Sequence, residues 1–193
     1  MKPRVLVIFG TSYGQTEKIA RRIAATLERS EITVELCDAA KTRPARATEQ
    51  YSAVLVGSSI IAGGHQPAIK RFVHENLAVL NRLPSAFFQV SASAGSGSPH
   101  ARMAAQRIME EFLAHKTWTP LLSASLAGAI NYTRYNLLLR WYMKKASEKN
   151  GGSTDTSRDH EYTDWVQVER FAATFALLIK PARRASPEPA LSA

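Results

Sequence analysis

Short apolar runs alternate along this chain with stretches in which apolar residues recur at helical spacing. The runs occupy residues 4–9, 33–37, 53–58, 85–91 and about 121–129. Between the first two runs, the helical stretch carries Ile19, Ala20, Ile23, Ala24 and Leu27, the spacing of a helix with one buried face. Nearly all-apolar runs joined by helices are typical of parallel strands that are covered on both faces. The pattern therefore predicts an α/β fold, a three-layer sandwich with a five-stranded parallel sheet and helices on both faces.

The connections predict the remaining elements and the extent of the domain. Further helices are expected from Pro67 through Leu77, over 100–115, over 134–149 and after residue 162. The polar stretch 38–50 is expected to be a loop or a poor short helix. Some thirty residues, 131–161, separate the fifth strand from the last helix and predict a helical insertion. We expect one domain over 1–180 and a disordered tail over 181–193, which holds three prolines.

The first strand ends in a loop that is suited to binding a phosphate. Gly10 and Gly14 tolerate backbone angles and close approaches that a side chain would block. Thr11, Ser12 and Thr16 supply hydroxyl groups. The free amides that open the next helix point at the same place, where the helix dipole favours negative charge. A capped turn without any ligand is the alternative.

The spacing in this loop excludes two well-known nucleotide sites. No lysine follows Gly14, so the P-loop pattern is not met, and there is no G-x-G-x-x-G for a dinucleotide. What remains is a [ST]-x-x-G-x-[ST] loop, which resembles the loop with which flavodoxins hold the phosphate of flavin mononucleotide (FMN).

Two further loops are expected at the same edge of the sheet, because ligands of open parallel sheets lie beyond the carboxyl ends of the strands. These are residues 58–65 and 91–99, both rich in Gly or Ser. Small residues let backbone amides and carbonyls reach the edge of a flat ring. The three loops together predict one site for a phosphate and a ring, although such loops are also Gly-rich in proteins that bind nothing there.

The C-terminal third narrows the resemblance to one family. Gly-Gly-Ser-Thr-Asp-Thr at 151–156 precedes Tyr-Thr-Asp-Trp-Val-Gln-Val at 162–168, and Tyr-Thr-Arg-Tyr stands at 132–135. With Pro-Ser-Ala-Phe at 84–87 and Ala-Gly-Ala at 127–129, these segments resemble the flavodoxin-like, quinone-dependent protoporphyrinogen IX dehydrogenases. The resemblance covers about residues 4–179. It departs at 91–99, which is neutral here until His100 and Arg102, whereas the family has a long basic segment.

The resemblance implies an oxidoreductase of haem biosynthesis. Such an enzyme would bind one FMN, oxidise protoporphyrinogen IX to protoporphyrin IX and pass electrons to a respiratory quinone, menaquinone or ubiquinone. The cofactor-binding residues implied by position are Thr11, Ser12, Tyr13, Gly14, Gln15, Thr16, Ser58, Ser59, Ile60, Ile61, Gly63, Ser91, Ala92, Ser93, Gly152, Thr154 and Asp155.

Two side chains are candidates for handling the substrate. His65 lies in a predicted flavin loop and titrates near neutral pH, so it is our candidate proton relay. Arg134 is our candidate for holding a substrate carboxylate, as is Arg102, because guanidinium pairs with carboxylate through two parallel hydrogen bonds.

The helix predicted over 134–149 is expected to bury one face and to expose another. The buried face comprises Tyr135, Leu138, Leu139, Tyr142, Met143 and Ala146. Leu137 and Trp141 fall instead among Arg134, Arg140, Lys144 and Lys145. Basic residues interleaved with exposed Leu and Trp suit an anionic membrane surface; a buried contact within the domain or with a second copy is the alternative.

Charge and composition limit which partners, metals and locations are expected for this chain. The net charge of +9 favours an anionic partner, and since no nucleic-acid-binding motif accompanies it, nucleic acid is not expected. No metal-ligand spacing is present, and Cys37 is the single cysteine, which excludes an internal disulfide. No apolar run approaches the length of a membrane span, so we expect a cytoplasmic protein, peripheral at most on the inner face of the membrane. Three alternatives remain: an NAD(P)H:quinone reductase, a non-enzymatic FMN electron carrier, and a binding module that keeps the fold but has lost the flavin.

Overall fold

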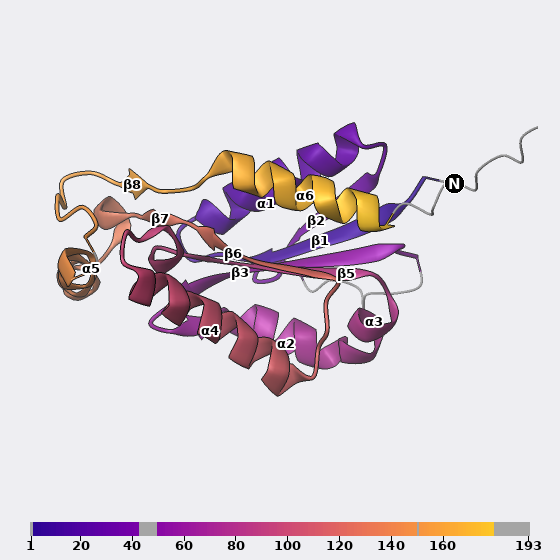
Figure 1. Ribbon diagram of the computed structural model, residues 1–193, viewed down its shortest axis with the longest axis horizontal. Coiled ribbons are helices and arrows are strands. Elements are labelled where there is room, and N and C mark those ends of the chain that lie inside the picture. The colour runs from indigo at the N-terminus through magenta and orange to yellow at the C-terminus, as the bar shows by residue number, and fades with distance from the viewer. Residues whose placement is uncertain (1, 43–49, 150, 180–193) are drawn as a thin grey trace, which may run out of the picture.

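Five parallel strands form the centre of the protein, in the order β2-β1-β3-β5-β6. The computed structural model describes residues 2–42, 50–149 and 151–179. The strands are β1 (Arg4–Gly10), β2 (Thr33–Asp38), β3 (Ala53–Ile61), β5 (Ser85–Ser91) and β6 (Leu122–Ala127). The predicted five-stranded parallel sheet and the three-layer α/β arrangement are confirmed (Figure 1).

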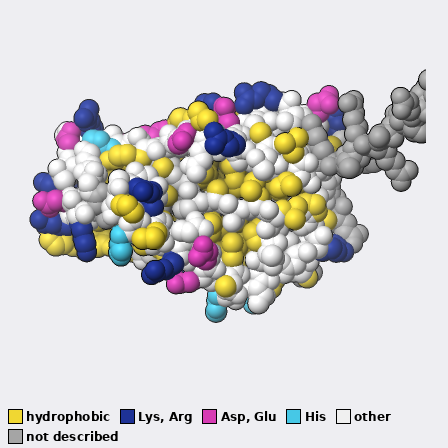
Figure 2. All heavy atoms as spheres, viewed as in Figure 1, with side chains coloured by type: hydrophobic (Ala, Val, Ile, Leu, Met, Phe, Trp, Pro, Cys, Tyr) yellow, Lys and Arg dark blue, Asp and Glu magenta, His cyan; other side chains and the backbone are white. Residues whose placement is uncertain are grey.

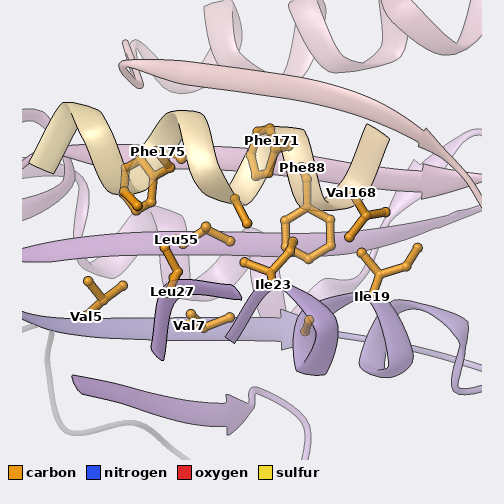
Figure 3. Packing of buried hydrophobic residues seen from close by; sticks show 14 of the residues in the cluster. Val5, Val7, Ile19, Ile23, Leu27, Leu55, Phe88, Val168, Phe171 and Phe175 are labelled. Atoms are coloured by element: carbon orange, nitrogen blue, oxygen red, sulfur yellow. The ribbon is translucent and has the colours of Figure 1, made fainter. Parts of the chain in front are cut away.

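Helices cover both faces of this sheet. Helices α1 (Gln15–Arg29) and α6 (Trp165–Ile179) lie on one face, and α2 (Pro67–Glu75), α3 (Leu77–Arg82) and α4 (Pro99–Lys116) lie on the other (Figure 1). Each face of the sheet has its own hydrophobic core. Figure 3 shows the core under α1 and α6, where Ile23 and Leu27 of α1 and Phe171 and Phe175 of α6 pack on the sheet. Because β1 and β3 are buried on both faces, their sequences are almost wholly apolar up to Gly57.

The structure refines several predicted boundaries. Strand β3 continues to Ile61 and turns back through positive φ angles at Ala62 and Gly63 into the short strand β4 (Gly64–His65). The helix predicted after Pro67 is interrupted at Asn76, whose side-chain amide donates to the Phe72 carbonyl. The predicted tail over 181–193 lies outside the described residues, as does the segment 43–49 of the predicted loop, which contains Pro44.

The segment between β6 and α6 forms a separate lobe at the carboxyl end of the sheet. A pair of short strands, β7 (Ala129–Ile130) and β8 (His160–Glu161), brackets it, and helix α5 (Leu137–Lys149) follows a 3₁₀ turn, η2 (Tyr132–Arg134). Figure 1 shows α5 at the far end of the molecule from the N-terminus. In the described part of the chain, no helix is both long and apolar enough to cross a bilayer.

Candidate functional site

The loop between β1 and α1 has the geometry of an anion site. Gly14 occupies the N-cap position of α1 with φ of 92°, and no side chain caps the first turn of the helix. The Thr11 hydroxyl accepts a hydrogen bond from the Gly14 amide at 3.0 Å, which holds the loop closed on itself. The amides that open α1 therefore face the loop with their partial positive charge uncompensated.

Thr16 supplies the clearest sign of a missing partner. Its side chain is 1% exposed, and its Oγ1 has no hydrogen-bond partner, alone in this respect among the buried side-chain nitrogen and oxygen atoms of the described residues. Leaving a hydroxyl buried and unpaired costs roughly 1–3 kcal/mol. A phosphate oxygen bound in the loop would satisfy this hydroxyl and the uncapped amides together, so the residues present fit the phosphate of FMN.

Gln66 links the phosphate loop to the second predicted loop. Its side-chain amide donates to the Ser12 hydroxyl at 2.7 Å and to the Ser59 hydroxyl at 2.8 Å, and its backbone amide donates to Ser58 at 3.0 Å. Gly10 permits this approach, because a Cβ there would lie 2.9 Å from the Gln66 Cβ. Gln66 is not among the residues predicted from the sequence; its position directly before Pro67, which starts the helix, was the available signal.

The three predicted loops meet at one cavity of about 330 Å³, within the size range of small-molecule sites. Most of the residues predicted to bind the cofactor line it: Thr11, Ser12, Tyr13, Gln15, Thr16, Ser59, Ile60, Ile61, Gly63, Ser91, Ala92, Ser93 and Gly152. Gly14 and Ser58 lie beside these residues without lining the cavity. The cavity is therefore built from the carboxyl ends of β1, β3 and β5, as the topology of a parallel sheet requires.

Helix α5 adds an apolar wall to this cavity. Leu139, Met143 and Ala146 face it from α5, together with Tyr135 just before the helix. Leu139, Met143 and Tyr135 belong to a third small core around Ile130 and Tyr132, against which the Tyr13 ring of the phosphate loop packs. The Tyr13 and Tyr135 rings meet edge to face, with centroids 4.7 Å apart. The cavity thus has a polar end at the phosphate loop and an apolar side under α5.

With this geometry in place, comparison with known proteins is informative. The sequence matches the family described as Flavodoxin domain over residues 6–157. It is 34% identical over 175 residues to Protoporphyrinogen IX dehydrogenase (quinone) of Escherichia coli K12, an alignment that covers 91% of this chain and 96% of that protein. The protein of the same name from Leishmania major is 32% identical over 178 residues, covering 91% of this chain and 76% of that protein.

This chain belongs to the protoporphyrinogen IX dehydrogenase (quinone) family. The predicted resemblance is confirmed, and solved structures agree on the flavodoxin fold. Oxidised flavodoxin 1 from Bacillus cereus superposes with a TM-score of 0.55 at 19% identity, covering 90% of this chain and 97% of that one. A flavodoxin from the domain Archaea gives 0.52 at 16% identity, covering 92% and 99%.

His65 is buried and does not line the cavity. Its ring is buried beside Phe112, with centroids 4.3 Å apart, and Nε2 bonds Gln89 Oε1 at 3.1 Å. Burial lowers the pKa of His65 to about 4, although the hydrogen bond to Gln89 opposes the shift. The ring is therefore neutral at physiological pH, and its place in the core gives no support to the predicted relay.

Thr154 and Asp155 are likewise outside the cavity, in contrast to Gly152. The Asp155 carboxylate accepts hydrogen bonds from the Ser157 hydroxyl at 2.6 Å and amide at 3.0 Å and pairs with Arg158 at 3.1 Å. The Ser157 hydrogen bonds, with a smaller contribution from Arg158, hold the pKa of Asp155 below its ordinary value. Its local bonds give it a role in the turn after α5, and its place outside the cavity gives no support to the predicted cofactor contact.

The two candidate arginines are bound to backbone carbonyls. Arg134 Nη1 donates to the Tyr13 carbonyl at 3.1 Å, and Arg102 Nη1 donates to the Ser96 carbonyl at 2.6 Å. Neither guanidinium lines the cavity. Arg134 instead lies against the phosphate loop, a position that its sequence neighbourhood did not predict because 121 residues separate it from Tyr13.

The predicted faces of α5 are wrong in part. Leu138 and Tyr142 were expected in the core but are 77% and 53% exposed. Arg140 was expected to face outward, whereas its guanidinium turns in and donates to the Tyr132 and Tyr135 carbonyls at 3.0 and 3.3 Å. The spacing of apolar residues identifies one face of a helix, but α5 packs on a small lobe and not on the sheet. Arg140 turns inward because it donates to two backbone carbonyls of that lobe.

Proposed function

We propose that this chain binds FMN in the cavity at the carboxyl edge of its sheet and oxidises protoporphyrinogen IX to protoporphyrin IX, with electrons passed to a respiratory quinone. The observation that carries the proposal is the unpaired hydroxyl of Thr16 at the uncapped start of α1, because Thr16 also lines the cavity with the apolar wall. Membership of the protoporphyrinogen IX dehydrogenase family supports the choice of substrate and acceptor.

The polar end of the cavity binds and orients the cofactor. The Thr11, Ser12 and Thr16 side chains and the first amides of α1 would hold the phosphate, without any lysine in the loop. Gln66 fixes Ser12 and Ser59 relative to one another, so the phosphate loop and the 58–63 loop are presented as one rigid edge. Small residues at 91–93 leave room for a flat ring between the loops.

The apolar wall suits the other reactant. When bound, FMN supplies the redox chemistry, accepting hydride equivalents from carbon. Leu139, Met143 and Ala146 exclude water from that reaction and offer a flat, largely hydrocarbon surface to a macrocycle or a quinone ring. Tyr142 stands at the rim, because it both lines the cavity and is 53% exposed.

The flavin half-reaction tests this function. FMN-loaded protein is mixed anaerobically with protoporphyrinogen IX, and bleaching of the flavin absorbance is recorded; NADPH is the matched control donor. We expect rapid bleaching by the porphyrinogen, reversed by menaquinone or ubiquinone, and slow bleaching by NADPH. Rapid bleaching by NADPH alone would instead favour an NAD(P)H:quinone reductase.

We further propose that the outer face of α5 docks on an anionic membrane surface. Leu137, Leu138 and Trp141 are 81%, 77% and 61% exposed, and Lys144 and Lys145 flank them on the same helix. Figure 2 shows basic side chains and hydrophobic atoms together at the end of the molecule where α5 lies. Apolar side chains that enter the head-group layer, with cations at its phosphates, are the usual elements of interfacial binding. Docking there would bring the rim of the cavity to the quinone.

A further inference from the structure

The phosphate loop contains no cation of its own. Residues 10–17 include no lysine or arginine, and the next residue, Lys18, directs its ammonium to Glu161 at 3.3 Å. A phosphate monoester carries close to two negative charges near neutral pH. Hydroxyls and amides can bind it, but they leave most of its charge to the helix dipole.

One guanidinium from the insertion lies against this loop. Arg134 Nη1 donates to the Tyr13 carbonyl at 3.1 Å and lies 3.8 Å from the place that a Cβ on Gly14 would occupy. Gly14 is the N-cap of α1, so the charge stands beside the residue that precedes the free amides. The bond to Tyr13 uses one of the five N–H donors of the guanidinium.

The position of Arg134 is fixed by its neighbours on both sides. Thr133 donates to Asp159 Oδ1 from its amide and its hydroxyl, each at 2.9 Å, which holds the 3₁₀ turn. Tyr135 packs its ring edge to face on Tyr13. The insertion therefore contacts the phosphate loop through two consecutive residues, 134 by a hydrogen bond and 135 by ring packing.

We propose that Arg134 is the cation of the phosphate site, supplied by the insertion of the same chain, and that it strengthens binding of the FMN phosphate. The inference rests on the proposed function, because it requires FMN in this cavity. It replaces the expectation that Arg134 holds a substrate carboxylate. It also gives the insertion a role in retaining the cofactor, besides forming the cavity wall.

Paired titrations with FMN and riboflavin, which lacks the phosphate, test this role. Apo protein is titrated by flavin fluorescence at low and high salt, for the wild type, Arg134→Gln and Arg134→Lys. Arg107→Gln, which removes an exposed arginine from α4, is the control for net charge. Thermal unfolding of each apo variant shows whether it is folded.

We expect Arg134→Gln to weaken FMN binding about tenfold at low salt, the scale of one charge-assisted interaction, and less at high salt because of screening. Riboflavin binding should stay unchanged, and Arg134→Lys should recover part of the loss. Unchanged FMN affinity in Arg134→Gln, or equal losses for FMN and riboflavin, would overturn the inference alone. A wild-type protein that binds neither flavin would overturn the proposed function together with it.

Discussion

At the scale of single residues, the unpaired Thr16 hydroxyl is the feature that separates a binding loop from an ordinary turn. Thr26, on the same helix, is also buried, but its hydroxyl donates to the Arg22 carbonyl at 2.9 Å. The two threonines therefore lie on the same helix and are both buried, but only the Thr26 hydroxyl has a hydrogen-bond partner within the protein. That difference makes them a matched pair for experiment.

Replacing Thr16 by Val should weaken FMN binding about tenfold and leave the apo protein as stable as the wild type or more stable, because an unsatisfied hydroxyl is removed. Thr26→Val should do the reverse, lowering apo stability by about 1 kcal/mol with FMN affinity unchanged. Flavin titration and chemical unfolding of both variants measure this. A loss of apo stability in Thr16→Val would show that the hydroxyl has a partner within the protein.

His65 predicts a pH dependence of stability. Its folded pKa of about 4 lies below the ordinary 6.5, so the unfolded chain binds the proton more readily and the folded protein loses stability as the pH falls from about 6.5 to 4. The full loss from this group is about 3 kcal/mol. Urea unfolding across this pH range should show a shallower decline for His65→Gln than for the wild type.

The exposed His74 on α2 provides the control. His74→Gln should retain the wild-type decline in the free energy of unfolding. Parallel pH profiles for the wild type and His65→Gln would contradict the buried, neutral state of His65.

The residues that the sequence could predict are those whose chemistry is local. Thr11, Ser12 and Thr16 follow directly from the loop pattern, and the structure places all three on the cavity. Gln66 and Arg134 act through partners 54 and 121 residues away, so no local pattern indicates them. His65 was misplaced because its environment, between Phe87 and Phe112, is a property of the packed core.

At the scale of elements, the sheet was predictable and the insertion was only partly so. Strands β1 and β3 are buried on both faces, which leaves an unmistakable apolar run in the sequence. Helix α5 packs instead on a small lobe, so only a narrow inner face is covered and Leu138 is left exposed. A period of 3.6 residues gives the spacing of the apolar positions but not the width of the surface that meets them.

This exposed face of α5 predicts the membrane behaviour. Trp141→Glu should reduce co-sedimentation with vesicles that contain an anionic phospholipid, because it removes an interfacial indole and adds a charge that the lipid repels. Val166→Glu is the matched control, since Val166 is 63% exposed on α6 and receives the same charge. Equal binding of both variants and the wild type would contradict docking through α5.

At the scale of the whole molecule, the fold and the insertion contribute different parts of the proposed site. The flavodoxin fold, which this chain shares with flavodoxins at below 20% identity, brings three loops to one edge of the sheet. The lobe around α5 adds the apolar wall, the guanidinium of Arg134 and the exposed apolar face within one segment. The net charge of +9 is consistent with an anionic partner.

We propose above all that this cavity, loaded with FMN, transfers electrons from protoporphyrinogen IX to quinone. The most direct measurement is porphyrin fluorescence during anaerobic incubation of the FMN-loaded protein with protoporphyrinogen IX and menaquinone. We predict fluorescence that grows with both enzyme and quinone, above the uncatalysed rate, and more slowly with Thr16→Val at limiting FMN. Bound flavin with no growth above the uncatalysed rate would contradict the account.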